Sequence, residues 1–144
     1  MLGSENPRST PSEVTVRPIF TWTYTVLLAL AFVGAGAAKL TAAPVMVEQF
    51  RSFGYPLWFM YVTGAIEFAC GLLVLVPRFA HVAAGILACV MAGAIVSHLA
   101  YGQISTIVPP VLLLILALVT GTLRGWGQVR GRGREAAGFP ADFR

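Results

Sequence analysis

Three ionisable side chains interrupt long apolar stretches of this sequence, and they are the residues best placed to do chemistry. Glu67 is the only carboxylate in any of those stretches, whereas Lys39 and His98 each stand near the end of one. An ionisable side chain at the centre of a membrane costs roughly 3 kcal/mol, so such residues usually serve a function. We therefore predict a polar pocket with Glu67, His98 and Lys39 as candidate catalytic residues, their individual roles unassigned.

Each of these residues also has a purely structural explanation, and the sequence leaves both open. Glu67 can be a neutral hydrogen-bonding group between helices, Lys39 can extend to the lipid headgroups, and His98 can bond a backbone carbonyl. Burial disfavours a carboxylate, and a lysine that reached down to Glu67 would favour one. Because Lys39 stands at the edge of its stretch, depth alone predicts an unpaired, neutral Glu67.

Metal and thiol chemistry have less support. One histidine with one glutamate provides too few ligands for a metal site, and His81 falls at the opposite end of the stretch that holds His98. Cys70 and Cys89 show no CxxC or metal-ligand spacing. We predict no metal site, and a disulfide between the two cysteines is a disfavoured alternative.

Four apolar stretches must position the three side chains. They cover residues 19–40, 57–76, 79–99 and 104–123, and at about 1.5 Å per residue each spans a hydrocarbon core of ~30 Å. Charged residues make up only 11 % of the chain, against about 25 % in ordinary globular domains. In lipid every backbone polar group needs an internal partner, so the stretches are predicted to be helices.

The predicted fold class is therefore all-α, an integral membrane four-helix bundle with up-down-up-down order. Short connections near Pro77 and near residues 101–103 make consecutive helices antiparallel. Residues 44–53 predict a short interfacial helix between the first two spans, because Met46, Phe50 and Phe53 recur at helical spacing. An irregular loop is the alternative for this segment.

The chain divides into a 19–123 transmembrane domain between two flexible tails, residues 1–18 and 124–144. Under the positive-inside rule, basic residues near helix ends place both tails in the cytoplasm of a bacterium, with the bundle in its inner membrane. Seven arginines lie on the side of the termini, against Lys39 and Arg51 on the other: Arg8, Arg17, Arg78, Arg124, Arg130, Arg132 and Arg134. A signal-peptidase site at residues 35–37 is a disfavoured alternative, since the leader is long and acidic.

Small residues and prolines give further expectations about packing. Residues Gly85, Cys89, Gly93 and Ser97 recur every four positions and predict a ridge against a neighbouring helix. Close contacts are also expected at Gly64 and Gly71 on the second span, and at Gly34 and Ala38 on the first. Pro109 and Pro110 are expected to interrupt the hydrogen bonds of the fourth span.

Several segments of the sequence resemble the DoxX-like family of small four-helix membrane proteins. They are GAGAAKL (34–40), FRSFGYPLW (50–58), GAIEFACGLLVLVPR (64–78) and MAGAIVSHL (91–99). The resemblance implies a four-helix membrane fold, and Lys39, Glu67 and His98 match polar residues that recur in the family without assigned roles. It also implies a link to membrane redox complexes, because the family is named after a subunit of a thiosulfate:quinone oxidoreductase.

The leading hypothesis is an accessory or quinone-facing subunit that works beside a redox partner protein. The sequence leaves its cofactor unknown, with a quinone as one candidate. A stand-alone membrane enzyme that uses Glu67 on a lipophilic small molecule is one alternative. A small transporter or proton path is another, although the four stretches contain few polar residues. The lipid bilayer is the expected surrounding partner, and nucleic acid is not expected because no basic stripe interleaved with aromatics occurs.

Overall fold

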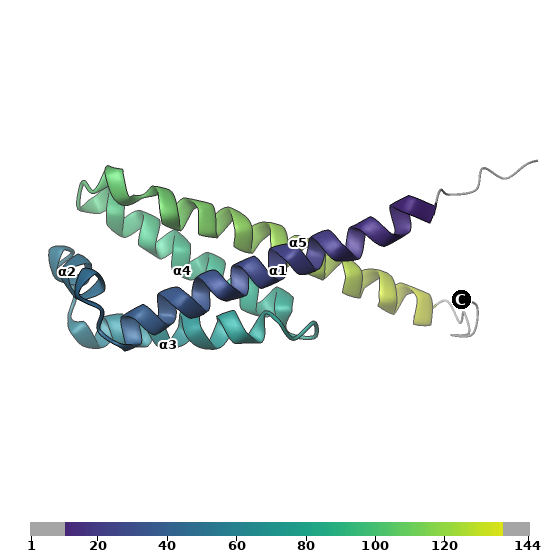
Figure 1. Ribbon diagram of the computed structural model, residues 1–144, viewed down its shortest axis with the longest axis horizontal. Helices are drawn as coiled ribbons and strands as arrows, with labels where there is room; N and C mark the ends of the chain where they lie inside the picture. The colour runs from purple at the N-terminus through teal and green to yellow at the C-terminus, as the bar shows by residue number, and fades with distance from the viewer. Residues whose placement is uncertain (1–10, 137–144) are drawn as a thin grey trace, which may run out of the picture.

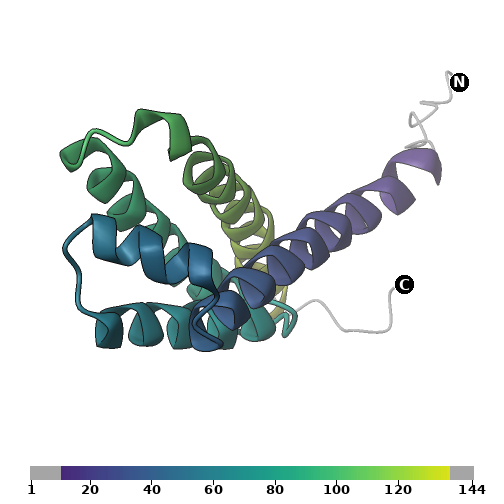
Figure 2. The same cartoon turned by 60° about the vertical axis from the view of Figure 1, so that its left-hand side comes forward.

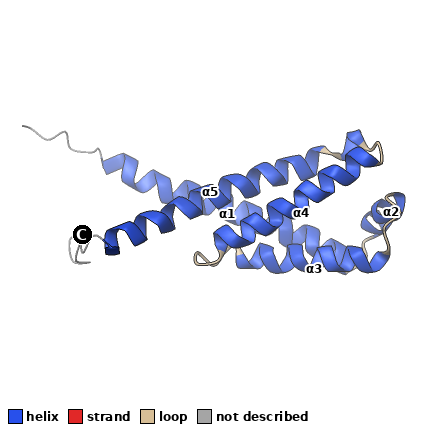
Figure 3. Ribbon diagram, turned by 180° about the vertical axis from the view of Figure 1, so that it is seen from behind, coloured by secondary structure: helices blue, strands red, loops and turns tan. Residues whose placement is uncertain are grey.

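The computed structural model describes residues 11–136 and, within them, the side chains of residues 19–125. All elements in this part of the chain are helical (Figure 3). In chain order they are α1 (Pro11–Leu40), α2 (Pro44–Ser52), α3 (Leu57–Leu73), α4 (Ala80–Ala100), the 3-10 turn η1 (Ile104–Thr106) and α5 (Val108–Ala136). The predicted all-α fold, including the short helix at residues 44–53, is confirmed.

The long helices α1, α3, α4 and α5 run alternately in opposite directions along the long axis of the molecule (Figure 1). The most extensive contacts join α1 to α3 and α4 to α5, and smaller ones join α1 to α5 and α3 to α4. Helix α2 lies across one end of the bundle (Figure 2). We call this the α2 end, and the opposite end, with the α3–α4 turn and the crossing of α1 and α5, the far end.

The length and hydropathy of the helices identify a multi-pass membrane protein. Residues 19–40, 80–100 and 104–125 are each long and apolar enough to cross a membrane. Helix α3 has 17 residues, or roughly 25 Å of rise. It passes the same test only when joined to α2, from which it is bent by 120°. Large hydrophobic side chains such as Leu30, Trp58 and Val96 are exposed on the helices, as lipid contact requires.

The aliphatic core fills the part of the bundle nearer the far end. It combines residues from all four long helices: Leu28, Ala29, Phe32, Cys70, Val74, Ala80, Ala83, Ala84, Leu87, Ala88, Met91 and Ala117. Buried residues nearer the α2 end are of a different kind, because they include Glu67, Ser97 and His98 beside Phe50 and Phe53. The buried Glu67 and His98 therefore both lie toward the α2 end, whereas Thr25 and Thr120 are buried polar residues nearer the far end.

Close approach of α1 and α3 is made by glycines. A Cβ on Gly36 would lie 2.6 Å from the Phe68 nitrogen, and one on Gly71 would lie 3.0 Å from the Val33 nitrogen. The expected close contacts at Gly64 and Gly71 are confirmed. The expectation for Gly34 is wrong, since nothing lies within 4 Å of a Cβ there and its place is taken by Gly36.

The predicted packing ridge on α4 is wrong for three of its four residues, and Ser97 is the one that is buried. Gly85 and Gly93 have nothing within 4 Å of an added Cβ, and Cys89 is exposed. The buried face of α4 is instead the alanine-rich one that carries Ala84 and Leu87. Small residues at helical spacing occur on both faces of α4, and only the packed structure distinguishes them.

The prolines of the last span also have a different role from the one predicted. Helix α5 begins at Val108, so Pro109 and Pro110 stand in its first turn, where no intrahelical hydrogen bond is lost. The prediction that they interrupt the helix is wrong, because the predicted helix began at residue 104, inside what is a separate 3-10 turn.

The outer bounds of α1 and α5 differ from the predicted ones. Helix α1 begins at Pro11 rather than at residue 19, and α5 continues to Ala136 rather than to residue 123. The remaining parts of the predicted tails, residues 1–10 and 137–144, lie outside the described residues. The division into tails and a transmembrane domain stays a prediction.

Candidate functional site

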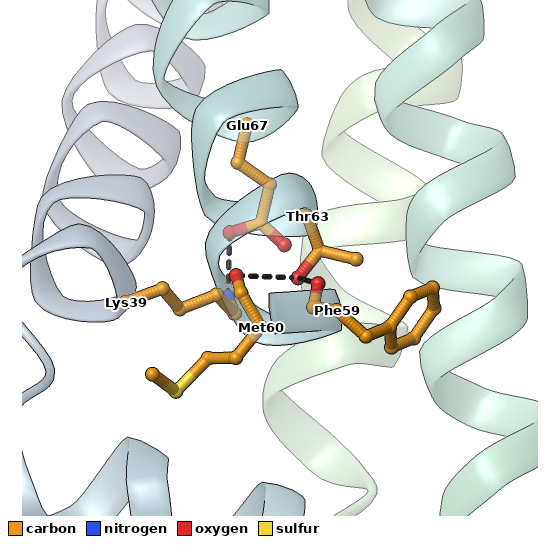
Figure 4. A network of polar contacts seen from close by, with 5 residues as sticks. All are labelled: Lys39, Phe59, Met60, Thr63 and Glu67. Atoms are coloured by element: carbon orange, nitrogen blue, oxygen red, sulfur yellow. Dashed lines mark hydrogen bonds and ion pairs between the residues drawn. The ribbon is translucent and has the colours of Figure 1, made fainter. Parts of the chain in front are cut away.

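Lys39 of α1 and Glu67 of α3 form an ion pair inside the bundle (Figure 4). The Lys39 Nζ donates to the Glu67 Oε2 over 2.5 Å. The Glu67 side chain is 2 % exposed and that of Lys39 is 12 % exposed. The prediction of an unpaired Glu67 is therefore wrong. Lys39 and Glu67, which the structure brings together, are two of the three residues that were predicted to share a pocket.

The direction in which helical side chains tilt explains why depth alone gave the wrong prediction for Glu67. Each Cα–Cβ bond tilts toward the N-terminus of its own helix. Because α1 and α3 are antiparallel, Lys39 leans away from the α2 end and Glu67 leans toward it. The lysine has four methylene groups of reach, so the two charges meet between the levels of their Cα atoms.

The helix contact beneath the ion pair belongs to the same arrangement. A Cβ on Gly64 would lie 2.7 Å from the Lys39 Cβ and 3.2 Å from the Gly36 oxygen. Each charged residue follows its contact glycine by three positions, so glycine and charge share one side of each helix. The sequence therefore encodes the ion pair and the close crossing together.

The ion pair leaves hydrogen-bonding capacity unused within the part of the chain that the structure describes. One of the three Lys39 N–H donors is engaged by Glu67, and the second carboxylate oxygen of Glu67 has no donor there. In Figure 4 this oxygen is turned away from Lys39. The neighbouring Thr63 does not use it, because its hydroxyl donates to the Phe59 and Met60 carbonyl oxygens at 3.1 Å and 2.9 Å. A ligand could therefore meet both a donor and an acceptor.

His98 is 3 % exposed and makes its contacts with a different set of residues. Its Nδ1 is 3.0 Å from the Thr106 hydroxyl, and its Nε2 is 3.3 Å from the Gln49 amide nitrogen. The Thr106 hydroxyl donates its own hydrogen to the Gln103 carbonyl, so Nδ1–H must donate to Thr106. The Gln49 amide donates to Nε2. This pattern fits the neutral ring with its hydrogen on Nδ1.

A cluster of aromatic rings at the α2 end contacts this histidine through Phe53. Phe53 meets His98 edge to face, with centroids 5.0 Å apart and planes at 89°. The other rings in the cluster, joined in turn by centroid distances of 5.2 Å to 6.3 Å, are Phe50, Tyr55, Trp58, Phe59 and Tyr101. We call these residues with Phe53 the aromatic cap. The rings of the aromatic cap offer apolar faces, and its polar groups include the Tyr hydroxyls.

The three predicted residues therefore divide into two groups. Lys39 and Glu67 are bonded to each other, and His98 bonds neither of them among the described residues. Sequence reasoning did not single out Gln49 or Thr106, because polar residues in connecting segments are common and carry no helical period. The predicted helix at residues 44–53 was a signal for Gln49, because it brings this residue to the end of the bundle, and it gave none for Thr106.

Comparison with known proteins agrees with this architecture. The family model described as DoxX-like family matches residues 23–120. The chain is a member of the DoxX-like family. An uncharacterized protein YdgD of Bacillus subtilis (strain 168) is 36 % identical over 100 residues, which are 65 % of this chain and 88 % of that protein. No solved structure matches the chain.

The DoxX-like match contains Lys39, Glu67 and His98 together with all the core residues named above. It contains Thr25 of α1 but not Arg124 of α5, and these two residues bond each other in a second polar cluster at the far end. The cysteines of this DoxX-like protein are free, Cys70 buried and Cys89 exposed. Among the described residues, no group of three His, Cys, Asp or Glu side chains could hold a metal ion.

Proposed function

We propose that this DoxX-like protein is an accessory subunit of a membrane-associated redox system, and that its Lys39–Glu67 pair binds the carbonyl end of a quinone. It would work in the bacterial inner membrane with both termini in the cytoplasm. The observation that carries the proposal is a buried ion pair whose donors and acceptor are only partly used. Of the three candidate catalytic residues, the proposal gives Lys39 and Glu67 direct contact with the ligand and His98 a supporting role.

The chemistry of the pair suits a quinone. A quinone oxygen accepts hydrogen bonds and gains negative charge on reduction, so an ammonium group within reach stabilises both forms. Glu67 is a group beside it that can accept or release a proton when a quinone changes between its oxidised and reduced forms. The aromatic cap at the same end is an apolar surface on which a ring can stack.

His98 has a supporting role in the proposal. Both of its ring nitrogens are engaged, by Gln49 and Thr106, so it holds α2 and η1 in place rather than contacting the ligand. The aromatic cap is joined to α2 through Phe50, which lies in that helix, and Phe53, which follows it. His98 therefore acts as a positioning residue for the ligand-facing rings.

Quinone binding to the purified protein tests the proposal. We would measure binding of a short-chain ubiquinone analogue by titration calorimetry in detergent, for wild type, Lys39→Met and Glu67→Gln. Loss of a charged hydrogen bond is worth about 1.5–3 kcal/mol, so Lys39→Met is expected to weaken binding more than tenfold. Glu48→Gln and Arg51→Met, which change exposed charges on α2, serve as matched controls.

Two results would contradict the proposal. If the wild type bound no quinone, or if Lys39→Met bound it equally well, the quinone would not bind at this site. Copurification of an oxidoreductase subunit with the tagged protein from its native membrane would support the accessory role. Turnover of a lipophilic substrate by the purified protein alone would instead favour the stand-alone enzyme.

A further inference from the structure

Arg124 forms a fixed cationic site at the far end of the bundle. Its Nε and Nη2 donate to the Thr25 hydroxyl over 3.2 Å and 3.0 Å. Its guanidinium carbon lies 4.5 Å from the centre of the Trp22 ring. Thr25 is 0 % exposed, and its hydroxyl donates a hydrogen bond to the Thr21 carbonyl. The guanidinium is therefore held in one orientation across α1 and α5.

This cation has no carboxylate partner among the side chains that the structure describes. The acidic side chains there are Glu48 on α2 and Glu67, which pairs with Lys39. A guanidinium has five N–H donors, and three of those of Arg124 have no acceptor in the described part of the chain. An oriented cation with unused donors is the kind of site that takes an anion bidentately.

An apolar groove shares a wall with this cation. It is shallow and open, and it is lined by Ile19, Trp22, Thr23, Val26 and Leu27 of α1. These positions follow the spacing of one helical face. Trp22 belongs both to this lining and to the stack with Arg124. The groove lies in a stretch long and apolar enough to cross a membrane, so hydrocarbon chains are its natural surroundings.

We propose that this site binds one anionic phospholipid, with the phosphate on Arg124 and an acyl chain along the groove. The charge favours this occupant, because the phosphate supplies the missing anion and an anionic headgroup leaves no cation to repel the guanidinium. The position favours it too, since tryptophan and arginine at the end of a span mark the level of the headgroups. A zwitterionic lipid offers the same acyl chain without the net charge.

Quenching of Trp22 fluorescence by brominated lipids tests the proposal. Trp58→Phe and Trp126→Phe leave Trp22 as the single reporter in the full chain. The protein is reconstituted in equal mixtures of phosphatidylglycerol and phosphatidylcholine, with bromine on the acyl chains of one or the other. Attraction of one basic residue to an anionic lipid corresponds to about a fivefold preference. We expect this preference for phosphatidylglycerol in the wild-type background and its loss in Arg124→Gln.

Controls separate this site from general electrostatic attraction. Arg78→Gln removes the same charge from the α3–α4 turn, where Arg78 lies over Phe79, and is expected to keep the preference. Equal quenching by both lipids, an unchanged preference in Arg124→Gln, or equal losses in both variants would overturn the proposal. Loss of the preference on adding inorganic phosphate would also overturn it, because the anion would then not need to be a lipid. If Arg124→Gln does not fold, Thr25→Val tests the proposal instead. This variant removes the acceptor that orients the Arg124 guanidinium and should reduce the preference for phosphatidylglycerol.

Discussion

The Cβ of Lys39 lies 2.7 Å from the position that a Cβ on Gly64 would occupy. Two carbon atoms that are not bonded would clash at this distance. Because Gly64 has no Cβ, α3 can approach the Lys39 side chain closely. The same approach brings Glu67, one turn further along α3, to the Lys39 ammonium group. The helix crossing and the ion pair should therefore respond together to a change at Gly64.

Gly64→Ala is expected to destabilise the protein and to loosen the ion pair. The added methyl group meets the Lys39 stem and the Gly36 carbonyl, and overpacking of this kind costs about 1–3 kcal/mol. Gly93→Ala is the matched control, because nothing lies within 4 Å of a Cβ there. The free energy of unfolding in detergent measures both. Equal losses at the two positions would contradict the assigned contact.

Lys39→Met is expected to destabilise the protein more than Glu67→Gln. The methionine variant leaves a carboxylate that is 2 % exposed without its cation, and such a loss costs about 3–5 kcal/mol. The glutamine variant leaves a lysine that is 12 % exposed and can turn toward the lipid headgroups. The double variant should be more stable than Lys39→Met alone. A double-mutant cycle of unfolding free energies checks this, and simple additivity would contradict a direct pair.

The spans could be predicted because their signal is local. A run of about 20 apolar residues predicts a membrane helix whatever its neighbours are, so the four long helices and their order follow from the sequence. The ion pair could not be predicted from the depth of the Cα atoms alone. The side chains of Lys39 and Glu67 tilt toward each other because their helices are antiparallel neighbours.

Helix faces were harder to predict than helix positions. In a membrane both the core and the lipid are apolar, so hydropathy does not distinguish Ala84, which is 1 % exposed, from the exposed Gly85 beside it. The contacts of His98 were missed for another reason. Gln49 and Thr106 come from connecting segments, and their positions depend on how the chain turns after each span.

His98→Ala is expected to loosen α2 while the four long helices remain packed. The change removes the bonds to Gln49 and Thr106 and the edge-to-face contact with Phe53. Amide hydrogen exchange in detergent should become faster in residues 44–52 and stay slow in α3. His81→Ala is the matched control, since the buried His81 Nδ1 has no hydrogen-bond partner among the described residues. Unchanged exchange in α2 would mean that His98 does not hold it.

Both termini are expected to lie in the cytoplasm. The seven arginines near helix ends on the side of the termini outnumber Lys39 and Arg51 on the other side, and basic residues are retained inside. Of the two, Lys39 is engaged with Glu67, which leaves Arg51 as the exposed basic residue of the α2 end. An alkaline phosphatase fused after Arg144 should be inactive, because the enzyme folds only outside the cytoplasm, and one inserted after Gly102 should be active. The opposite pattern would place α2 in the cytoplasm and would move the quinone site and the Arg124 lipid site to the other leaflets.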